Sequence, residues 1–154
     1  MPTAQATAPA GYAFPALTGR VVDTADLLSP PQEAALSAQS AALEKATGHQ
    51  FVIVTVPGLG SHSIEDYGLH LGRYWGVGRK DVNDGVLLLV APTERKVRIE
   101  VGYGLETTLS DPKAKTIIDK DILPAFRAGD LPRGIIAGAA AITRTLEPVG
   151  AKAT

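Results

Sequence analysis

The sequence predicts an α/β fold, a three-layer α/β/α sandwich in which helices cover both faces of a mixed sheet. Two apolar, β-branched runs at 50–56 and 86–90 are separated by a helical pattern, which indicates two strands joined by a crossover helix. The connection from the second run to an alternating run at 96–101 consists of only four residues, 92–95. So short a connection permits an antiparallel hairpin but not a parallel crossover.

The ends of the chain differ in composition from its centre. Residues 1–13 are rich in Ala, Pro and Thr and carry no charge, and they are predicted to form a disordered lead-in. Residues 148–154 are predicted to form a disordered tail. One folded domain is therefore expected over residues 14–147.

The first helix begins with a capping box. Ser29 is followed by two prolines and by Gln32, whose side chain is placed to reach back to the N-cap backbone. Gly48 suits the C-terminal end of this helix. The run at 50–56 is then stopped by a Pro-Gly pair and reads as a buried strand.

A second helix is predicted from Ser63, with acidic residues in its first turn, and it ends at Gly76. A third helix opens at Asp111 and is kinked or ended by Pro124. Gly129 marks a turn into the last helix, which carries apolar residues at helical spacing.

Composition excludes several classes of function. The 154-residue chain has 15 Lys and Arg against 16 Asp and Glu, with a formal charge of −1, which argues against nucleic acid as a partner. The absence of cysteine excludes thiol catalysis, disulfides and zinc held by thiolates. No nucleotide-binding or nucleophile motif occurs, and the three histidines lack metal-ligand spacing.

The apolar run at 134–142 is too short to span a bilayer, and the first residues lack the features of a signal peptide. A monomer is expected.

Acidic and amide side chains are predicted to gather at one edge of the sheet. If strand 50–56 runs upward, the crossover helix returns the chain to the lower edge, where strand 86–90 begins. The hairpin then brings strand 96–101 down to the same edge. Loop 81–85 should therefore meet segment 106–111. The side chains expected to converge are Asp81, Asn83, Asp84, Glu106 and Asp111.

These five side chains offer only oxygen ligands, a set that hard cations prefer. Four carboxylates close together would repel each other, and a divalent cation would remove that cost. The donor set therefore predicts a site for a hard divalent cation such as Ca²⁺ or Mg²⁺. Structural roles compete with this interpretation, because Asp84 is typical of a turn before a strand, Asp111 of a helix N-cap and Asp81 of a solvated loop. Asp23 follows a short apolar pair and is a sixth candidate ligand, but the pattern does not assign it to either edge.

A set of motifs resembles the TPM domain family, which is named after a thylakoid-lumen protein, a photosystem II repair protein and an acetylcholine-receptor accessory protein. In chain order the motifs are LTGRVVD (17–23), LLS (27–29), TGHQ (47–50), IExY (64–67), WGVG (75–78), NDGVLLLV (83–90), VRIEVGYGLE (97–106) and IxPxFRxGD (122–130). The resemblance covers about residues 14–146, and ordered motifs over such a span are specific.

The resemblance implies an α/β sandwich that lies outside the cytoplasm, in the periplasm or cell envelope. Relatives commonly carry a signal peptide and a transmembrane helix, so the full-length protein is expected to be membrane-anchored. Some relatives are linked to Ca²⁺ binding and acid phosphatase activity, others to the assembly or maintenance of membrane protein complexes. The resemblance therefore implies a cation-binding accessory module whose partner is a membrane protein complex. The alternative is a metal-dependent phosphatase acting on a small phosphate ester, with its catalytic residues unknown.

Overall fold

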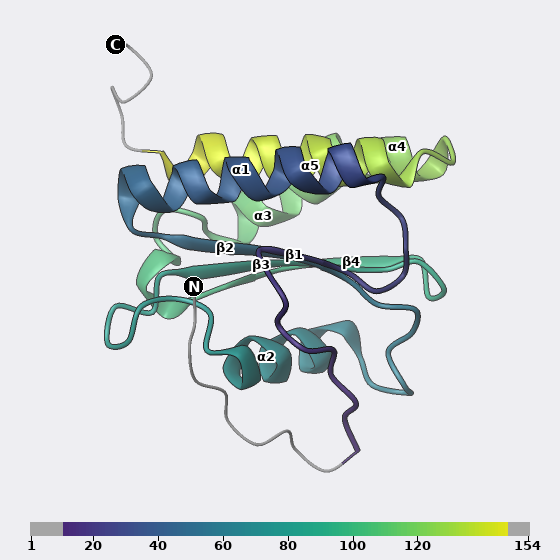
Figure 1. Ribbon diagram of the computed structural model, residues 1–154, viewed down its shortest axis with the longest axis horizontal. Coiled ribbons are helices and arrows are strands. Elements are labelled where there is room, and N and C mark those ends of the chain that lie inside the picture. The colour runs from purple at the N-terminus through teal and green to yellow at the C-terminus, as the bar shows by residue number, and fades with distance from the viewer. Residues whose placement is uncertain (1–10, 148–154) are drawn as a thin grey trace.

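A four-stranded sheet lies between two layers of helices in the computed structural model, which describes residues 11–147 (Figure 1). Its strands, in spatial order, are β1 (Val21–Asp23), β2 (Gln50–Thr55), β3 (Gly85–Ala91) and β4 (Lys96–Val101). The first three strands are parallel, and β4 is antiparallel to β3. The predicted mixed sheet, crossover helix and hairpin are confirmed. The disorder predicted for residues 1–10 and 148–154 lies outside the described residues.

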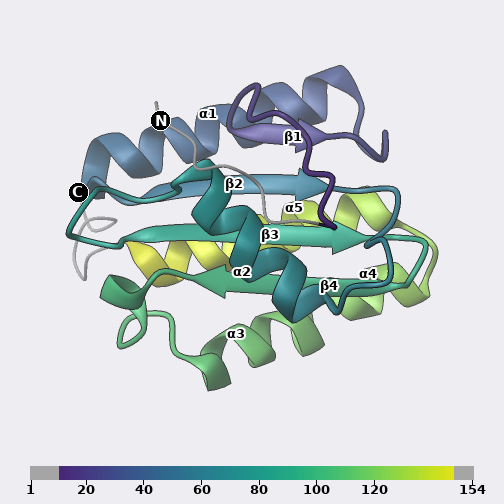
Figure 2. The same cartoon turned by 90° about the horizontal axis from the view of Figure 1, so that it is seen from below.

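One helix covers one face of the sheet, and the remaining helices cover the other. The crossover helix α2 (Ile64–Trp75) crosses the face seen in Figure 2. The opposite layer contains α1 (Pro30–Thr47), α3 (Asp111–Ile117), α4 (Leu123–Arg127) and α5 (Leu131–Leu146). Two short helical turns, η1 (Tyr103–Leu105) and η2 (Ile118–Ile122), flank α3. The three-layer arrangement is therefore asymmetric in the amount of helix on each side.

The helix ends follow from local side-chain chemistry. The Ser29 hydroxyl accepts a hydrogen bond from the Gln32 amide at 3.3 Å, and the Gln32 side chain accepts one from the Ser29 amide at 2.8 Å. This is the predicted capping box, and it satisfies two amides at the start of α1. Gly48 ends α1 with a φ of 82°, a conformation that glycine adopts without steric cost. Ser63 is the N-cap of α2.

The predicted third helix is divided into three parts. Its N-cap is Ser110, whose hydroxyl accepts a hydrogen bond from the Lys113 amide, while Asp111 is the first helical residue. The π turn of η2 separates α3 from α4, and Pro124 lies in the first turn of α4, the part of a helix in which proline is tolerated.

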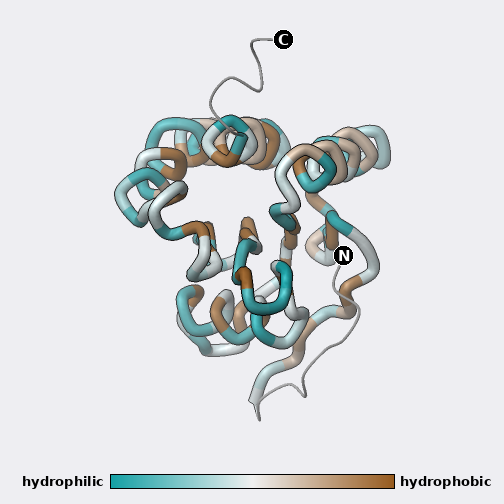
Figure 3. The backbone as a smooth tube through the Cα atoms, turned by 90° about the vertical axis from the view of Figure 1, so that its left-hand side faces the viewer, coloured by the Kyte–Doolittle hydropathy of each residue, from teal (hydrophilic) through white to brown (hydrophobic). Residues whose placement is uncertain are grey.

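Alternate side chains of the strands belong to two separate apolar layers. In Figure 3, which colours the backbone by hydropathy, hydrophobic stretches lie in the segments between the upper and lower helices. Leu88 of β3 packs in the layer beneath α1 and α5, whereas Leu87 and Leu89 face α2. Full burial of a leucine side chain stabilises a fold by about 1.5–3 kcal/mol. The continuous apolar run of β3 thus supplies both layers.

An extended segment before β1 completes the thin α2 layer. Tyr12 stacks on His62 with ring centroids 3.8 Å apart, and Phe14 packs edge-on against Tyr67. The indole N–H of the fully buried Trp75 donates a hydrogen bond to the Pro15 carbonyl at 3.0 Å. Residues 11–13 were expected to belong to the lead-in, but the contacts of Tyr12 make them part of the folded unit.

Within residues 11–147, no helix combines the length and apolar character required to cross a membrane.

Candidate functional site

Loop 81–85 lies at the lower edge of the sheet, where it contacts segment 102–104, which leads into the segment 106–111 that it was predicted to meet. The Asn83 carbonyl accepts a hydrogen bond from the Gly104 amide at 2.9 Å, and the Gly85 carbonyl accepts one from the Gly102 amide at 2.7 Å. The approach depends on glycine, because a Cβ atom at position 102 or 104 would collide with loop carbonyl oxygens. The topology thus brings the two segments to one edge of the sheet, and the backbone contacts that hold them involve residues 102 and 104 and not the predicted segment 106–111.

Asp84 is the buried residue of this edge, with only 1% of its surface exposed. Its Oδ1 accepts a hydrogen bond from the Arg79 amide at 2.8 Å, and its Oδ2 accepts bonds from Arg79 Nε at 2.9 Å and Nη2 at 2.7 Å. His49 Nδ1 lies 2.9 Å from the same Oδ2. Because an ionised carboxylate only accepts, His49 is the donor in this contact.

These donors determine the charge of Asp84. Burial raises the pKa of this carboxyl, but the hydrogen bonds from Arg79 and His49 outweigh burial and bring the pKa down to about 2. The carboxylate is therefore ionised near neutral pH and already balanced by the Arg79 guanidinium. Asp84 has a structural role that joins the loop before β3 to the loop before β2.

Sheet register explains why His49 reaches Asp84. Gln50 and Gly85 are register partners at the first rung between β2 and β3, so the preceding residues lie side by side. Gly48 permits the Arg79 guanidinium to lie against the end of α1, because a Cβ there would collide with it. Sequence reasoning did not identify Arg79 or His49 as functional neighbours.

The other predicted ligands of this edge are exposed. Among the described residues, no hydrogen bond is made by the side chains of Asp81, Asn83, Glu106 or Asp111. Asp81 and Asn83 have φ values of 67° and 55°, which Asp and Asn tolerate better than most residues. Over residues 11–147, no three His, Cys, Asp or Glu side chains form a group that could hold a metal ion. The donor set as it stands therefore does not fit a preformed Ca²⁺ site.

Asp23 lies at the opposite edge of the sheet, where the parallel strands end. Its carboxylate accepts hydrogen bonds from the amides of Leu27 at 2.9 Å and Leu28 at 2.8 Å. The buried Thr55 hydroxyl donates a third at 2.6 Å. These contacts stabilise the turn after β1, and the separation of the two edges removes Asp23 from the predicted ligand set.

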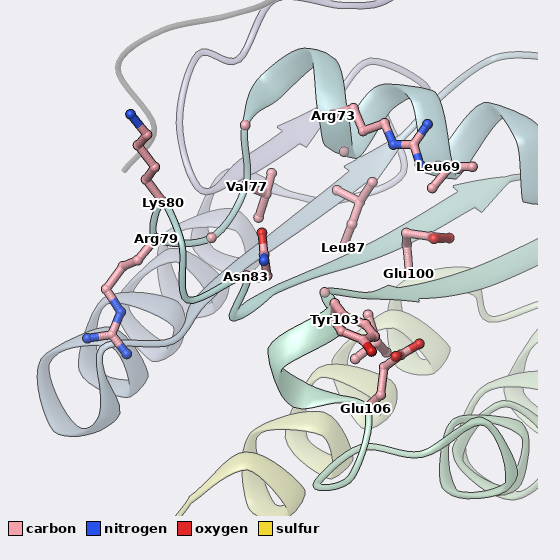
Figure 4. A pocket seen from close by; sticks show the side chains of 16 residues that line it. Leu69, Arg73, Val77, Arg79, Lys80, Asn83, Leu87, Glu100, Tyr103 and Glu106 are labelled. Carbon is pink, nitrogen blue, oxygen red and sulfur yellow. The ribbon is translucent and has the colours of Figure 1, made fainter.

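A pocket of about 670 Å³ opens between α2 and the lower ends of β3 and β4. Figure 4 shows Leu69 and Arg73 on the α2 wall, with Glu100, Tyr103 and Glu106 on the wall formed by β4 and η1. Tyr103 is 79% exposed, which is unusual for so large an aromatic side chain. An exposed aromatic at the rim of a pocket is a common feature of binding sites.

The charges around this pocket are only partly paired. Glu100 accepts from Arg98 Nε at 3.2 Å. Arg73 and Lys80 make no ion pair with another described residue, and neither does Glu106. None of the described residues that line the pocket is Ser, Thr, Cys or His. Nucleophiles of these four types are thus absent from its described lining.

Comparisons with known proteins agree with this architecture. The family model described as the TPM domain matches residues 21–145. The N-terminal domain of a protein from P. gingivalis, solved by NMR, is 38% identical, with a TM-score of 0.78 over 84% of this chain and 82% of that one. The BA42 protein from the psychrophilic bacterium Bizionia argentinensis is 19% identical, with a TM-score of 0.67 over 79% of this chain and 82% of that one.

A third solved structure, the N-terminal domain of a Corynebacterium glutamicum protein, is 14% identical, with a TM-score of 0.66 over 94% of this chain and 88% of that one. At these low identities the last two structures support the fold alone. No curated protein matches the chain.

Proposed function

Because this chain belongs to the TPM domain family, we propose that it is an extracytoplasmic accessory module that supports the assembly or maintenance of membrane protein complexes. The observation that carries this proposal is the pocket between α2 and the joined loops. It combines the exposed Tyr103 with Arg73, Lys80 and Glu106, which form no ion pair with another described residue, and its described lining holds no Ser, Thr, Cys or His nucleophile. Such a surface suits recognition of another molecule better than bond cleavage.

Photo-crosslinking tests the binding role. A photoreactive phenylalanine replaces Tyr103 in the full chain, and in a control it replaces Glu65, which is exposed on the first turn of α2. After irradiation in the native envelope, position 103 is expected to capture a subunit of a membrane protein complex. Capture that is equal from position 65, or capture of soluble proteins alone, would contradict the proposal.

Cation binding is the second part of the proposed function. Ca²⁺, with Mg²⁺ as the alternative, would be held by Asp81, Asn83 and Glu106, whose side-chain oxygen atoms have no hydrogen-bond partner among the described residues. The tie between the two loops supports this assignment, whereas the pairing of Asp84 with Arg79 leaves that carboxylate out of it. Since the carboxylates are not grouped in advance, we expect a weak site, with a Kd of about 10⁻⁴–10⁻³ M.

Calcium titration followed by amide NMR tests the cation site. Shifts are expected at Asn83 and Glu106, and the Kd should rise in Asp81→Asn and in Glu106→Gln. Glu65→Gln is the matched control, because this exposed carboxylate lies on α2 and away from both loops. Saturation at 100 times the Kd should stabilise the fold by about 2.7 kcal/mol. Equal titrations in all variants would exclude this site.

A phosphatase is the second candidate function. It is favoured by Arg73 and Lys80, two cations without a described ion pair that line the pocket and would attract a phosphate ester. Hydrolysis of p-nitrophenyl phosphate measures the activity directly. Turnover that requires divalent cation and falls in Arg73→Gln and Glu106→Gln would support a phosphatase. Turnover that persists in both variants would point to a contaminant.

A further inference from the structure

The outer edge of β4 is an unpaired row of backbone groups. Within residues 11–147, β4 pairs with β3 alone, and no described strand pairs with its other edge. In an antiparallel pair, successive residues direct their backbone groups alternately toward the partner strand and away from it. The bond from the Gly102 amide to the Gly85 carbonyl sets this alternation. The outward-facing residues are Val97, Ile99 and Val101, and no described residue forms a hydrogen bond with their outward N–H and C=O groups.

Helix α3 limits what can occupy this edge. It lies on the same side of the sheet as α5 (Figure 1) and beyond β4 when the sheet is viewed face-on (Figure 2). Paired strands are about 4.8 Å apart, whereas packed helices need about 8–10 Å between axes. If two copies paired through β4 about a twofold axis normal to the sheet, their α3 helices would compete for the same space. A single extended segment fits where a second copy does not.

The two faces of β4 differ in chemistry. Val97, Ile99 and Val101 alternate on the face toward the main helical layer, where all three belong to or pack against its core. Lys96, Arg98 and Glu100 occupy the face toward α2. Two cations against one carboxylate give these three β4 side chains a net positive charge, and Arg73 of α2, which has no ion pair with another described residue, adds to it.

A strand laid beside β4 would place alternate side chains on these two faces. Apolar side chains would lie next to the Val97, Ile99 and Val101 row, under α3. Acidic side chains would lie next to Lys96 and Arg98, where opposite charges on neighbouring strands are favourable. Beyond the end of β4, the pocket rim at Tyr103 offers a place for one larger side chain.

We propose that the free edge of β4 receives an extended segment of a partner protein, in which apolar residues alternate with Asp or Glu, as a fifth strand of the sheet. Main-chain hydrogen bonds to the outward-facing residues provide the attachment, and the charged α2 face selects acidic side chains. The inference deepens the proposed function, on which it rests for the existence of a protein partner. It does not depend on the cation.

Peptide binding to the full ¹⁵N-labelled chain tests this inference. The probe is a heptapeptide in which Val and Glu alternate, and the controls are a Val–Lys heptapeptide and a Val–Glu peptide with its acids in one block. The titrations are run with EDTA, so that the result for peptide binding does not depend on whether the proposed cation site exists. Only the alternating acidic peptide is expected to bind, and it should slow amide exchange at Val97, Ile99 and Val101 but leave Lys96, Arg98 and Glu100 unchanged.

Two variants test whether the peptide binds to the edge of β4 and not to another surface. Val97→Pro removes one outward N–H and leaves the ladder to β3 intact, because proline is accepted on a free strand edge; it should weaken binding about tenfold. Arg98→Glu keeps every backbone group, and it should make the protein bind the Val–Lys peptide more tightly than the Val–Glu peptide. This variant therefore tests the inference even if Val97→Pro does not fold. Equal binding of all three peptides, no binding of any, or exchange protection by self-association without peptide would overturn the inference.

Discussion

Replacing Asp84 with Asn should destabilise the fold by an amount that depends on pH. The pKa of this carboxyl falls from 3.8 to about 2 because hydrogen bonds from Arg79 and His49 outweigh its burial. Each pKa unit corresponds to 1.36 kcal/mol, so a decrease of about 1.8 units means that the folded protein favours the ionised form of Asp84 by about 2.4 kcal/mol relative to the unfolded chain. Asn places an N–H₂ group among donors, and breaking a buried ion pair costs about 3–5 kcal/mol. Arg79 is 47% exposed and recovers some hydration, so we expect a loss of about 2–3 kcal/mol.

The direction of the pH effect follows from the lowered pKa. A carboxyl whose pKa is depressed in the folded state contributes stability above its unfolded pKa and loses it as the pH falls through the folded value. The difference between wild type and Asp84→Asn should therefore be constant near neutral pH. It should shrink between about pH 4 and pH 2, where the wild-type carboxylate becomes protonated.

Urea unfolding followed by the fluorescence of Trp75, the one tryptophan in the chain, measures both effects. Asp81→Asn is the matched control, because Asp81 lies in the same loop but is exposed and has no described side-chain partner. Its free energy of unfolding should stay within about 0.5 kcal/mol of wild type. A loss in Asp84→Asn that is independent of pH, or an equal loss in Asp81→Asn, would refute the assignment of Asp84 as an ionised structural anchor.

Three further substitutions test how the edges of the sheet are built. Gly104→Ala should lower the free energy of unfolding by about 1–3 kcal/mol, because its Cβ would collide with the Val82 carbonyl, whereas Gly19→Ala, with open space around it, should change little in the same urea titration. Thr55→Val should cost about 1–3 kcal/mol by leaving the Asp23 carboxylate short of one donor, while Thr55→Ser should restore most of that loss; equal losses in both would contradict this role of the hydroxyl. Gly72→Ala should raise the stability of α2 by about 0.5–1 kcal/mol, and a lower melting temperature in thermal unfolding would contradict it.

Much of the fold could be predicted because local signals agree with the tertiary structure. The four residues between β3 and β4 allow only a hairpin, and the capping box at Ser29 marks the start of α1 without reference to any contact. The meeting of the loops at Asn83 and Gly104 followed from strand direction alone. Each of these inferences needs only sequence spacing and the handedness of crossovers.

The site was harder to predict because charge pairing depends on strand register. An apolar run such as β3 is buried on both faces, so its pattern does not specify which residue of β2 lies beside it. The sequence therefore did not predict the register that places His49 next to Asp84, and Asp84 was interpreted as a cation ligand. Arg79, five residues away in sequence, reaches Asp84 only because the loop between them folds back. Asp23 was unplaced for a related reason, since three residues are too few to identify β1 from its pattern.

The extended segment over α2 determines where the N-terminal boundary of this domain lies. The shared family pattern begins at residue 21, yet the indole of Trp75 finds its acceptor at Pro15, and Phe14 covers Tyr67. A fragment cut at the family boundary would expose these rings to water and leave the buried indole N–H without its acceptor. A family match marks the residues that relatives share, whereas the packing of a domain extends to every residue that covers its buried side chains, and here those residues begin several positions before the matched region.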